Sequence, residues 1–155
     1  MELLRVEHLS KIYGAGENQV KALDDVSLSV EKGEFVAIMG PSGSGKSTLL
    51  NILSTLMQPS SGSVTINNKN ILQMNDAEIA KFRGQDMGFI FQDYNLIESL
   101  TVQENISLPL TLQKASPKDI KKAVQKVAEL LHIESYLKQY PTELSGGQQQ
   151  RVGAA

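Results

Sequence analysis

The sequence contains no cysteine, which excludes both a disulfide framework and a thiolate metal site. It has no apolar stretch approaching twenty residues, so we expect these residues neither to insert into a membrane nor to carry a secretory signal. It also lacks an excess of charge, because fifteen basic and seventeen acidic residues give a net charge of −2. Without a basic cluster we expect no nucleic-acid partner. What the 155 residues do have is 41% hydrophobic content, enough for one sizeable core.

The clearest motif is a loop that fits G-x-x-x-x-G-K-[ST] at every fixed position. Its residues are Gly40, Pro41, Ser42, Gly43, Ser44, Gly45, Lys46 and Ser47, with Thr48 opening the next segment. An apolar run at 34–39 precedes the loop and predicts a strand buried on both faces, and the residues after the loop predict a helix. In such a loop the backbone N–H groups and the helix N-terminus face a phosphate, Lys46 reaches the β- and γ-phosphates and Ser47 binds Mg²⁺. Kinases, GTPases and transport ATPases share this motif, so it does not choose among them.

A second motif, Leu144-Ser145-Gly146-Gly147-Gln148, follows about a hundred residues later. A serine and two glycines at the start of a polar helix predict another helix N-terminus that accepts anions. Together with the P-loop, the motif closely resembles the signature of ATP-binding-cassette (ABC) ATPases. That resemblance implies ATP and Mg²⁺ as cofactors and a second copy of the subunit as partner. Two copies would pack head to tail, with Ser145 and Gly147 of one contacting the γ-phosphate bound at the partner's Lys46.

Two further positions match the family. Tyr13 resembles the aromatic residue that stacks on adenine, and its alternative is an ordinary surface tyrosine. The apolar segment 87–91 predicts a second strand, which ends at Gln92. Gln92 resembles the glutamine that touches Mg²⁺ or the attacking water; alone it would be a polar residue at a strand end. The segment from Gln92 to Ile106 resembles the stretch where the family's transmembrane permease subunits dock. The alternative is that the leucines and isoleucine of 96–100 form only an internal core.

The predicted fold is α/β: a P-loop NTPase (RecA-like) core, an N-terminal antiparallel β-subdomain and a mostly helical signature subdomain. We expect one ABC ATPase domain, with the β-subdomain and P-loop core at 1–92 and the helical subdomain at 93–155. Alternating stretches predict strands at 26–30 and 63–66, with a loop at 14–19. Capping residues predict a helix from Asn75 to about Arg83, and Ser116-Pro117 predicts the start of another.

The chain stops at Ala155, before the family's second acidic strand, its catalytic glutamate and its switch histidine. His8 and His132 lack the context of that histidine. Phosphoryl transfer to water needs a positioned nucleophile, so we expect these 155 residues alone to hydrolyse ATP poorly. The missing strand would lie beside the P-loop strand, so we also expect an exposed edge that favours aggregation.

The closest resemblance within the family is to subunits of lipoprotein-releasing, macrolide-efflux and antimicrobial-peptide-resistance transporters, on residues 13–23 and 91–97. It implies an ATPase that powers transport from the cytoplasmic face of the membrane, held there by permease subunits rather than by direct insertion. Two alternatives remain open: a truncated nucleotide-binding module without turnover, and a non-transport ABC-type ATPase of chromosome maintenance or DNA repair. The short segment between the two motifs disfavours the latter. Simple P-loop kinases and GTPases would leave the signature unexplained.

Overall fold

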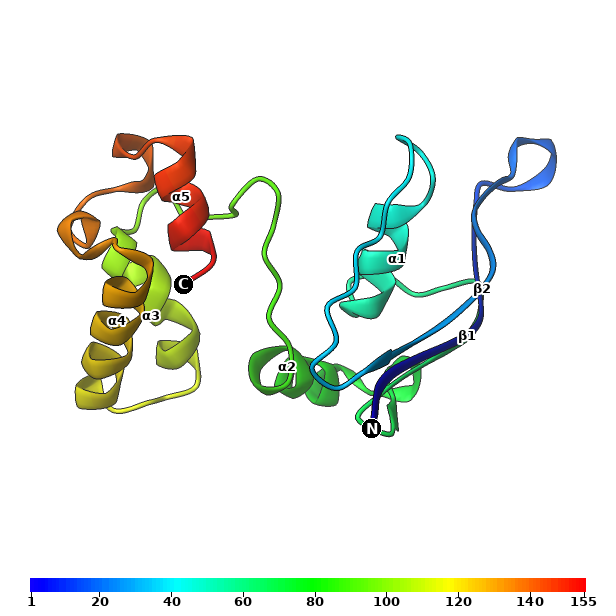
Figure 1. Cartoon of the computed structure of the whole chain (residues 1–155), viewed down its shortest axis with the longest axis horizontal. Coiled ribbons are helices and arrows are strands. Elements are labelled where there is room, and N and C mark those ends of the chain that lie inside the picture. The colour runs from blue at the N-terminus through cyan, green and yellow to red at the C-terminus, as the bar shows by residue number, and fades with distance from the viewer. The chain divides into compact units, whose positions relative to one another are not determined.

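The computed structural model describes all residues from 1 to 155 and divides the chain into two compact units (Figure 1). Unit 1 covers Met1–Gly88 and unit 2 covers Phe89–Ala155. The P-loop lies in unit 1 and the signature motif lies in unit 2. Each unit has its own cluster of buried hydrophobic side chains, and each is described separately below.

Unit 1 is built on a four-stranded antiparallel sheet of order β2-β1-β3-β4. Its strands are β1 (Glu2–Tyr13), β2 (Val20–Glu31), β3 (Ser61–Ile66) and the short β4 (Lys69–Asn70). Val6, on the central strand β1, pairs with Leu28 on one side and Val64 on the other. The predicted strands at 26–30 and 63–66 are therefore confirmed. The predicted loop at 14–19 is also confirmed, and it contains a short 3₁₀ turn, η1 (Gly16–Asn18).

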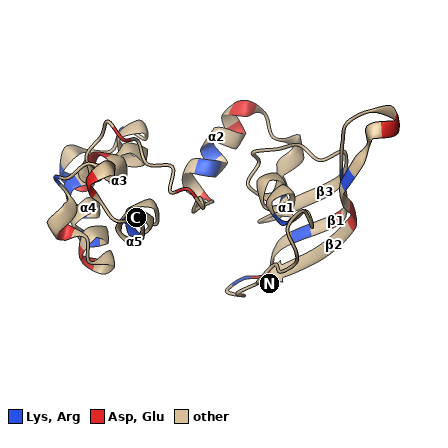
Figure 2. Ribbon diagram, turned by 90° about the horizontal axis from the view of Figure 1, so that it is seen from above, with Lys and Arg blue, Asp and Glu red and all other residues tan.

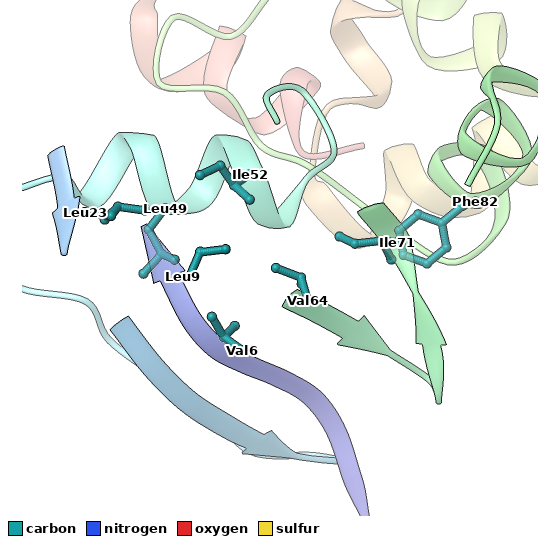
Figure 3. Close-up of a cluster of buried hydrophobic side chains, with 8 residues drawn as sticks. All are labelled: Val6, Leu9, Leu23, Leu49, Ile52, Val64, Ile71 and Phe82. Carbon is teal, nitrogen blue, oxygen red and sulfur yellow. The ribbon is translucent and has the colours of Figure 1, made fainter. Parts of the chain in front are cut away.

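The P-loop helix α1 (Lys46–Leu53) packs against this sheet (Figure 3). Leu49 and Ile52 are its buried residues, and they join Leu9 of β1 and other buried side chains in one hydrophobic cluster. Burying side chains of this size stabilises the fold by roughly 1.5–3 kcal/mol each relative to leaving them exposed. The core therefore fixes α1, and with it the end of the P-loop, on the antiparallel sheet.

Two predicted central strands do not form. Residues 34–39 before the P-loop and 87–91 before Gln92 have no regular secondary structure, so both predictions were wrong. Phe35 and Met39 are 95% and 87% exposed, whereas the sequence predicted burial on both faces. The physical reason is that a strand exists only when a neighbour satisfies its backbone N–H and C=O groups. The sheet contains only antiparallel pairs among β1 to β4, and neither segment joins it.

A second helix of unit 1, α2 (Asp76–Gln85), follows the 3₁₀ turn η2 (Ile71–Gln73). Its capping box is complete: Asn75 accepts from the backbone N–H of Glu78, and the Glu78 carboxylate accepts from the Asn75 N–H. Acidic residues occupy the first turn and basic residues the later turns (Figure 2), as the helix dipole favours. The helix start predicted from Asn75 is confirmed. Near its end, the Arg83 guanidinium donates to the Thr55 hydroxyl at 2.7 Å.

Unit 2 is helical, as predicted for the residues after 92. It contains α3 (Val102–Leu112), α4 (Pro117–Leu131) and α5 (Gly146–Gly153), with 3₁₀ turns η3 (Glu134–Tyr136) and η4 (Pro141–Glu143). Ser116 caps α4 through the Asp119 N–H, which confirms the helix start at Ser116-Pro117. The buried cluster consists of Val102, Ala128, Ile133, Leu144 and Val152. No helix of either unit has both the length and the apolar character needed to cross a membrane.

Candidate functional site

The P-loop wraps tightly around the N-terminus of α1. Gly45 is the N-cap residue and has a left-handed backbone with φ of +88°, which residues with a side chain rarely adopt. It also lies directly against β2, because a Cβ atom at this position would be 2.2 Å from the carbonyl oxygen of Ala22. Gly43 has a similar φ of +81°, but a Cβ there would meet nothing within 4 Å. The second fixed glycine of the motif is therefore required both by conformation and by packing.

Lys46 folds back over the loop that precedes it. Its ammonium group donates to the carbonyl oxygens of Gly40 at 2.9 Å and Pro41 at 2.7 Å, with the Ser44 hydroxyl at 3.4 Å. Lys46 is the only cationic side chain of the loop, and its ammonium group lies at the opening formed by residues 40–44. A phosphate oxygen there could accept from the same ammonium group, and charge-assisted bonds of this kind are stronger than those to neutral carbonyls.

The N-terminus of α1 differs from every other α-helix start in the chain. Side chains cap α2, α3, α4 and α5, through Asn75, Thr101, Ser116 and Ser145 respectively. No side chain accepts a hydrogen bond at the start of α1. The first turn of a helix has backbone N–H groups without intrahelical partners, and an anion satisfies them well. The uncapped start of α1 and the Lys46 ammonium therefore fit a phosphate group.

Tyr13 lies at the end of β1 and contacts the P-loop helix. Its hydroxyl is 3.4 Å from Oγ1 of Thr48 and donates to Sδ of Met57 at 3.0 Å. Tyr13 as a whole residue remains 39% exposed. The structure therefore brings Tyr13, predicted as the adenine-stacking residue, next to the P-loop helix. Met57 and Lys11 also contact Tyr13, and neither contact was predicted from the sequence. Met57 lies more than forty positions from Tyr13, so no local pattern links these two residues. Lys11 lies two positions before Tyr13 on β1, a spacing that places both on one face of the strand.

No group of three His, Cys, Asp or Glu side chains is placed to hold a metal ion. The residues predicted to bind Mg²⁺ were Ser47 and Gln92. Ser47 is exposed in the first turn of α1, where a hydroxyl oxygen suits a hard cation. Gln92 is exposed in a turn of unit 2. The assignment of Ser47 and Gln92 as ligands of Mg²⁺ therefore stays a prediction.

The signature motif forms the capped start of α5. The backbone N–H of Ser145 donates to the Gln148 side-chain oxygen at 2.7 Å, and the Ser145 hydroxyl accepts from the Gln148 N–H at 3.4 Å. A Cβ added to Gly146 would be 3.1 Å from the Tyr94 hydroxyl, whereas one added to Gly147 would meet nothing within 4 Å. The prediction of a helix that begins at this motif is confirmed, and the side of α5 at Gly147 is open.

Asn105, on α3, ties down the segment that follows Gln92. Its amide nitrogen donates to the carbonyls of Ile97, Leu100 and Thr101 at 3.0–3.1 Å, and its side-chain oxygen accepts from the Ile97 N–H at 2.8 Å. Ile97 is 42% exposed, while Leu96 and Leu100 are half-buried and Leu96 packs against the core of unit 2. The role of Asn105 was missed from the sequence, although its position one turn into a capped helix is a weak signal for such a tether.

The start of α3 carries a carboxylate that stabilises the same segment. The Thr101 backbone N–H and hydroxyl both donate to the Glu104 carboxylate at 2.8 Å. These bonds, the backbone one first, lower the pKa of Glu104 below its usual value. Because the folded-state pKa is the lower one, the capping box is intact above the ordinary glutamate pKa of about 4.3 and is lost as the pH falls through the folded-state value.

We therefore expect the amide resonance of Thr101 to titrate with a midpoint below about 4.3 when the chain is followed by NMR from pH 7 downward. The Glu104→Gln variant should show no such titration, because its amide keeps an acceptor oxygen that does not ionise in this range. A midpoint at or above the ordinary glutamate value would contradict the assignment of the bonds at the start of α3.

Comparison with known proteins decides the family. The family profile described as "ABC transporter" matches residues 23–155, which include both the P-loop and the signature. The chain belongs to the ABC transporter family. The resemblance inferred from the two motifs is therefore confirmed, as is the α/β P-loop NTPase fold class.

Among ABC transporter proteins, the chain is 45% identical to the bacitracin export ATP-binding protein BceA of Halalkalibacterium halodurans, over 100% of this chain and 61% of BceA. It is 46% identical to the macrolide export ATP-binding/permease protein MacB of Neisseria meningitidis, over 100% of this chain and 24% of MacB. It thus spans about three fifths of the length of the separate ATP-binding subunits that it matches.

A solved ABC cassette has the same fold. The dimeric ATP-binding cassette MJ0796, in a post-hydrolysis state with ADP and Pi, superimposes with a TM-score of 0.90 at 41% identity, covering 97% of this chain and 67% of that one. The nucleotide itself is a property of that solved structure.

Proposed function

We propose that the protein binds ATP with Mg²⁺ at Gly40–Thr48 and, as a whole protein, is the ATP-hydrolysing subunit of an ABC export system. One observation supports the nucleotide site above all others. Helix α1 begins without a side-chain cap, and at the same place the Lys46 ammonium group lies over the preceding loop. In the proposal the backbone of 40–46 surrounds the phosphates, Lys46 donates to the β- and γ-phosphates and Ser47 binds the metal ion. Mg²⁺ would neutralise the charge of the β- and γ-phosphate oxygens.

Tyr13 and Gln92 have separate roles in this proposal. Tyr13 presents an exposed ring beside Thr48, so it offers a π-face to adenine next to the phosphate site. Gln92 is exposed in its turn and would place its amide near Mg²⁺ or the attacking water. Positioning of water by a side-chain amide is a recurring part of phosphoryl transfer to water.

We further propose that two copies of the protein share each ATP. The open side of α5 at Gly147, the Ser145 hydroxyl and the backbone of Gly146 and Gln148 would contact the γ-phosphate held at the partner's Lys46. The dimeric state of MJ0796 with ADP and Pi supports this arrangement. The Ser145 hydroxyl accepts one bond within the helix cap and keeps its own proton to donate to a phosphate oxygen.

A groove on unit 2 is the proposed docking site for a membrane permease subunit. It has a volume of about 240 Å³ and is lined by the segment 89–97, by α3 and by the last residues of α5. Phe91 and Ile97, which line the groove, leave 37% and 42% of their surfaces exposed, so the groove presents apolar area to the solvent. Asn105 holds this segment in one conformation, so the groove would be preorganised for an apolar element of the permease.

A charged substitution at the groove tests the transporter function. Ile97→Asp places a carboxylate on the exposed apolar surface and should abolish co-purification with the permease, while ATP binding and folding stay as in the wild type. Ile97 is a better target than Leu96, because Leu96 also packs against the core of unit 2. The matched control is Leu130→Asp on α4, where an even more exposed side chain, at 75%, lies outside the groove.

Co-purification that survives Ile97→Asp, or that Leu130→Asp reduces equally, would contradict docking at this groove. Loss of the permease with Ile97→Asp alone would place the protein at the cytoplasmic face of a membrane through its partner. The relatives named for bacitracin and macrolide export support an export or peptide-handling system over the alternatives of a module without turnover and a non-transport ATPase.

A further inference from the structure

Lys11 is a half-buried lysine on β1 without a carboxylate partner. All five ion pairs of the chain involve other residues. Its ammonium group instead donates to the backbone carbonyl of Gln58 at 2.8 Å and lies over the ring of Tyr13, 5.4 Å from the ring centroid. A cation at this distance is attracted by the negative face of an aromatic ring. The position of Lys11 is therefore explained by Tyr13, two residues further along the same strand.

The Tyr13 ring is held at two places. At one end its hydroxyl contacts Thr48 and Met57, both in the region of α1, and on one face it carries the Lys11 ammonium. The Gln58 carbonyl in turn fixes the ammonium, so Lys11 links the end of β1 to the loop after α1. With 39% of Tyr13 exposed, a flat ligand can reach the ring only on the area that Lys11 leaves uncovered.

We infer that Lys11 is a positioning residue that holds the Tyr13 ring and directs a nucleobase to one face of it. The inference rests on the proposed function, in which Tyr13 stacks on adenine. The cation polarises the ring from its covered side, blocks that side and fixes the ring plane before the base arrives. Lys11 therefore contributes to the affinity for the base and leaves the affinity for the phosphates unchanged.

The test compares ATP with inorganic tripolyphosphate, which carries the phosphates without a base. Affinities of both, with Mg²⁺, are measured by calorimetry on the whole protein, and their ratio gives the contribution of the base together with its ribose. A cation–π contact is worth about 0.5–2 kcal/mol, so Lys11→Met should lower the ratio roughly twofold to thirtyfold. Lys11→Arg should keep most of the ratio, because a guanidinium also binds an aromatic face.

Two further variants separate this role from a general effect of charge or folding. Lys32→Met makes the same charge change in the turn that follows β2, near the start of β1 and far along that strand from Tyr13, and it should leave the ratio unchanged. In a Tyr13→Ala background, which removes the ring, Lys11→Met should have no further effect on the ratio.

The outcomes are distinct. A ratio unchanged by Lys11→Met overturns the inference, provided that Tyr13→Ala alone lowers the ratio. An equal loss for ATP and tripolyphosphate also overturns it, because Lys11 would then act on the phosphates or on the fold. If Tyr13→Ala leaves the wild-type ratio unchanged, the proposed stacking on Tyr13 is itself wrong, and the inference falls with it.

Discussion

Lys46→Ala should lower the affinity for Mg-ATP at least a hundredfold. The side chain is the only cation of the loop, and its ammonium already lies at the mouth formed by residues 40–44. Hydrogen bonds to charged groups contribute about 1.5–3 kcal/mol each, so losing bonds to two phosphates removes roughly 3–6 kcal/mol of binding free energy. Each 1.4 kcal/mol corresponds to about a factor of ten in the dissociation constant.

The measurement is equilibrium binding of ATP by calorimetry, with the thermal unfolding of each variant recorded beside it. Because Lys46 contacts only backbone carbonyls and one hydroxyl of an exposed loop, its removal should leave the unfolding temperature nearly unchanged. Lys81→Ala, on the exposed side of α2, serves as the charge-matched control and should bind ATP as the wild type does. A loss of affinity below about threefold, less than 1 kcal/mol, would contradict the proposed phosphate site.

Gly45→Ala should destabilise the fold by about 3 kcal/mol, while Gly43→Ala should cost about 1 kcal/mol. Both glycines have φ between +80° and +90°, so the conformational penalty for a side chain is nearly the same at the two positions. The difference lies in packing. The new methyl group at residue 45 would overlap the Ala22 carbonyl and press on Leu23 of the core, whereas that at residue 43 would point into open space.

Urea unfolding of the two variants measures this difference directly. Comparing two glycines of one loop removes the general cost of losing a flexible residue, so the gap of roughly 2 kcal/mol reports the contact between the P-loop and β2. Equal destabilisation of the two variants would mean that the backbone of β2 shifts to make room for the added methyl group. The close approach of Gly45 to β2 would then not restrict this position.

The features predicted best were those that depend on residues close together along the chain. The caps at Asn75, Ser116 and Ser145 were all found, because a cap is made by side chains and backbone groups three residues apart. The strands at 26–30 and 63–66 were also found, since their alternation of apolar and polar residues follows from one face being buried. The family followed from two motifs that the comparisons then confirmed.

The predictions that failed were those of strands, because a strand must pair with a neighbouring strand. The run at 34–39 has the composition of a buried parallel strand, but composition does not supply the neighbour that a strand requires. The same holds for 87–91. The contacts around Tyr13 were missed for a related reason: Thr48 and Met57 come near it only because α1 packs on the sheet through Leu49 and Ile52. Such pairs are products of the tertiary fold and leave no spacing in the sequence.

The uncapped start of α1 has a consequence for how the protein's stability depends on its ligand. Four helices complete their own first turn with a residue of the chain, and the fifth leaves that place to a phosphate in the proposed function. A ligand that binds only the folded state stabilises it in proportion to the logarithm of its concentration. The phosphate of a bound nucleotide would then take the place of the missing N-cap. The first turn of α1 would be stabilised while the nucleotide is bound and less stable after its release.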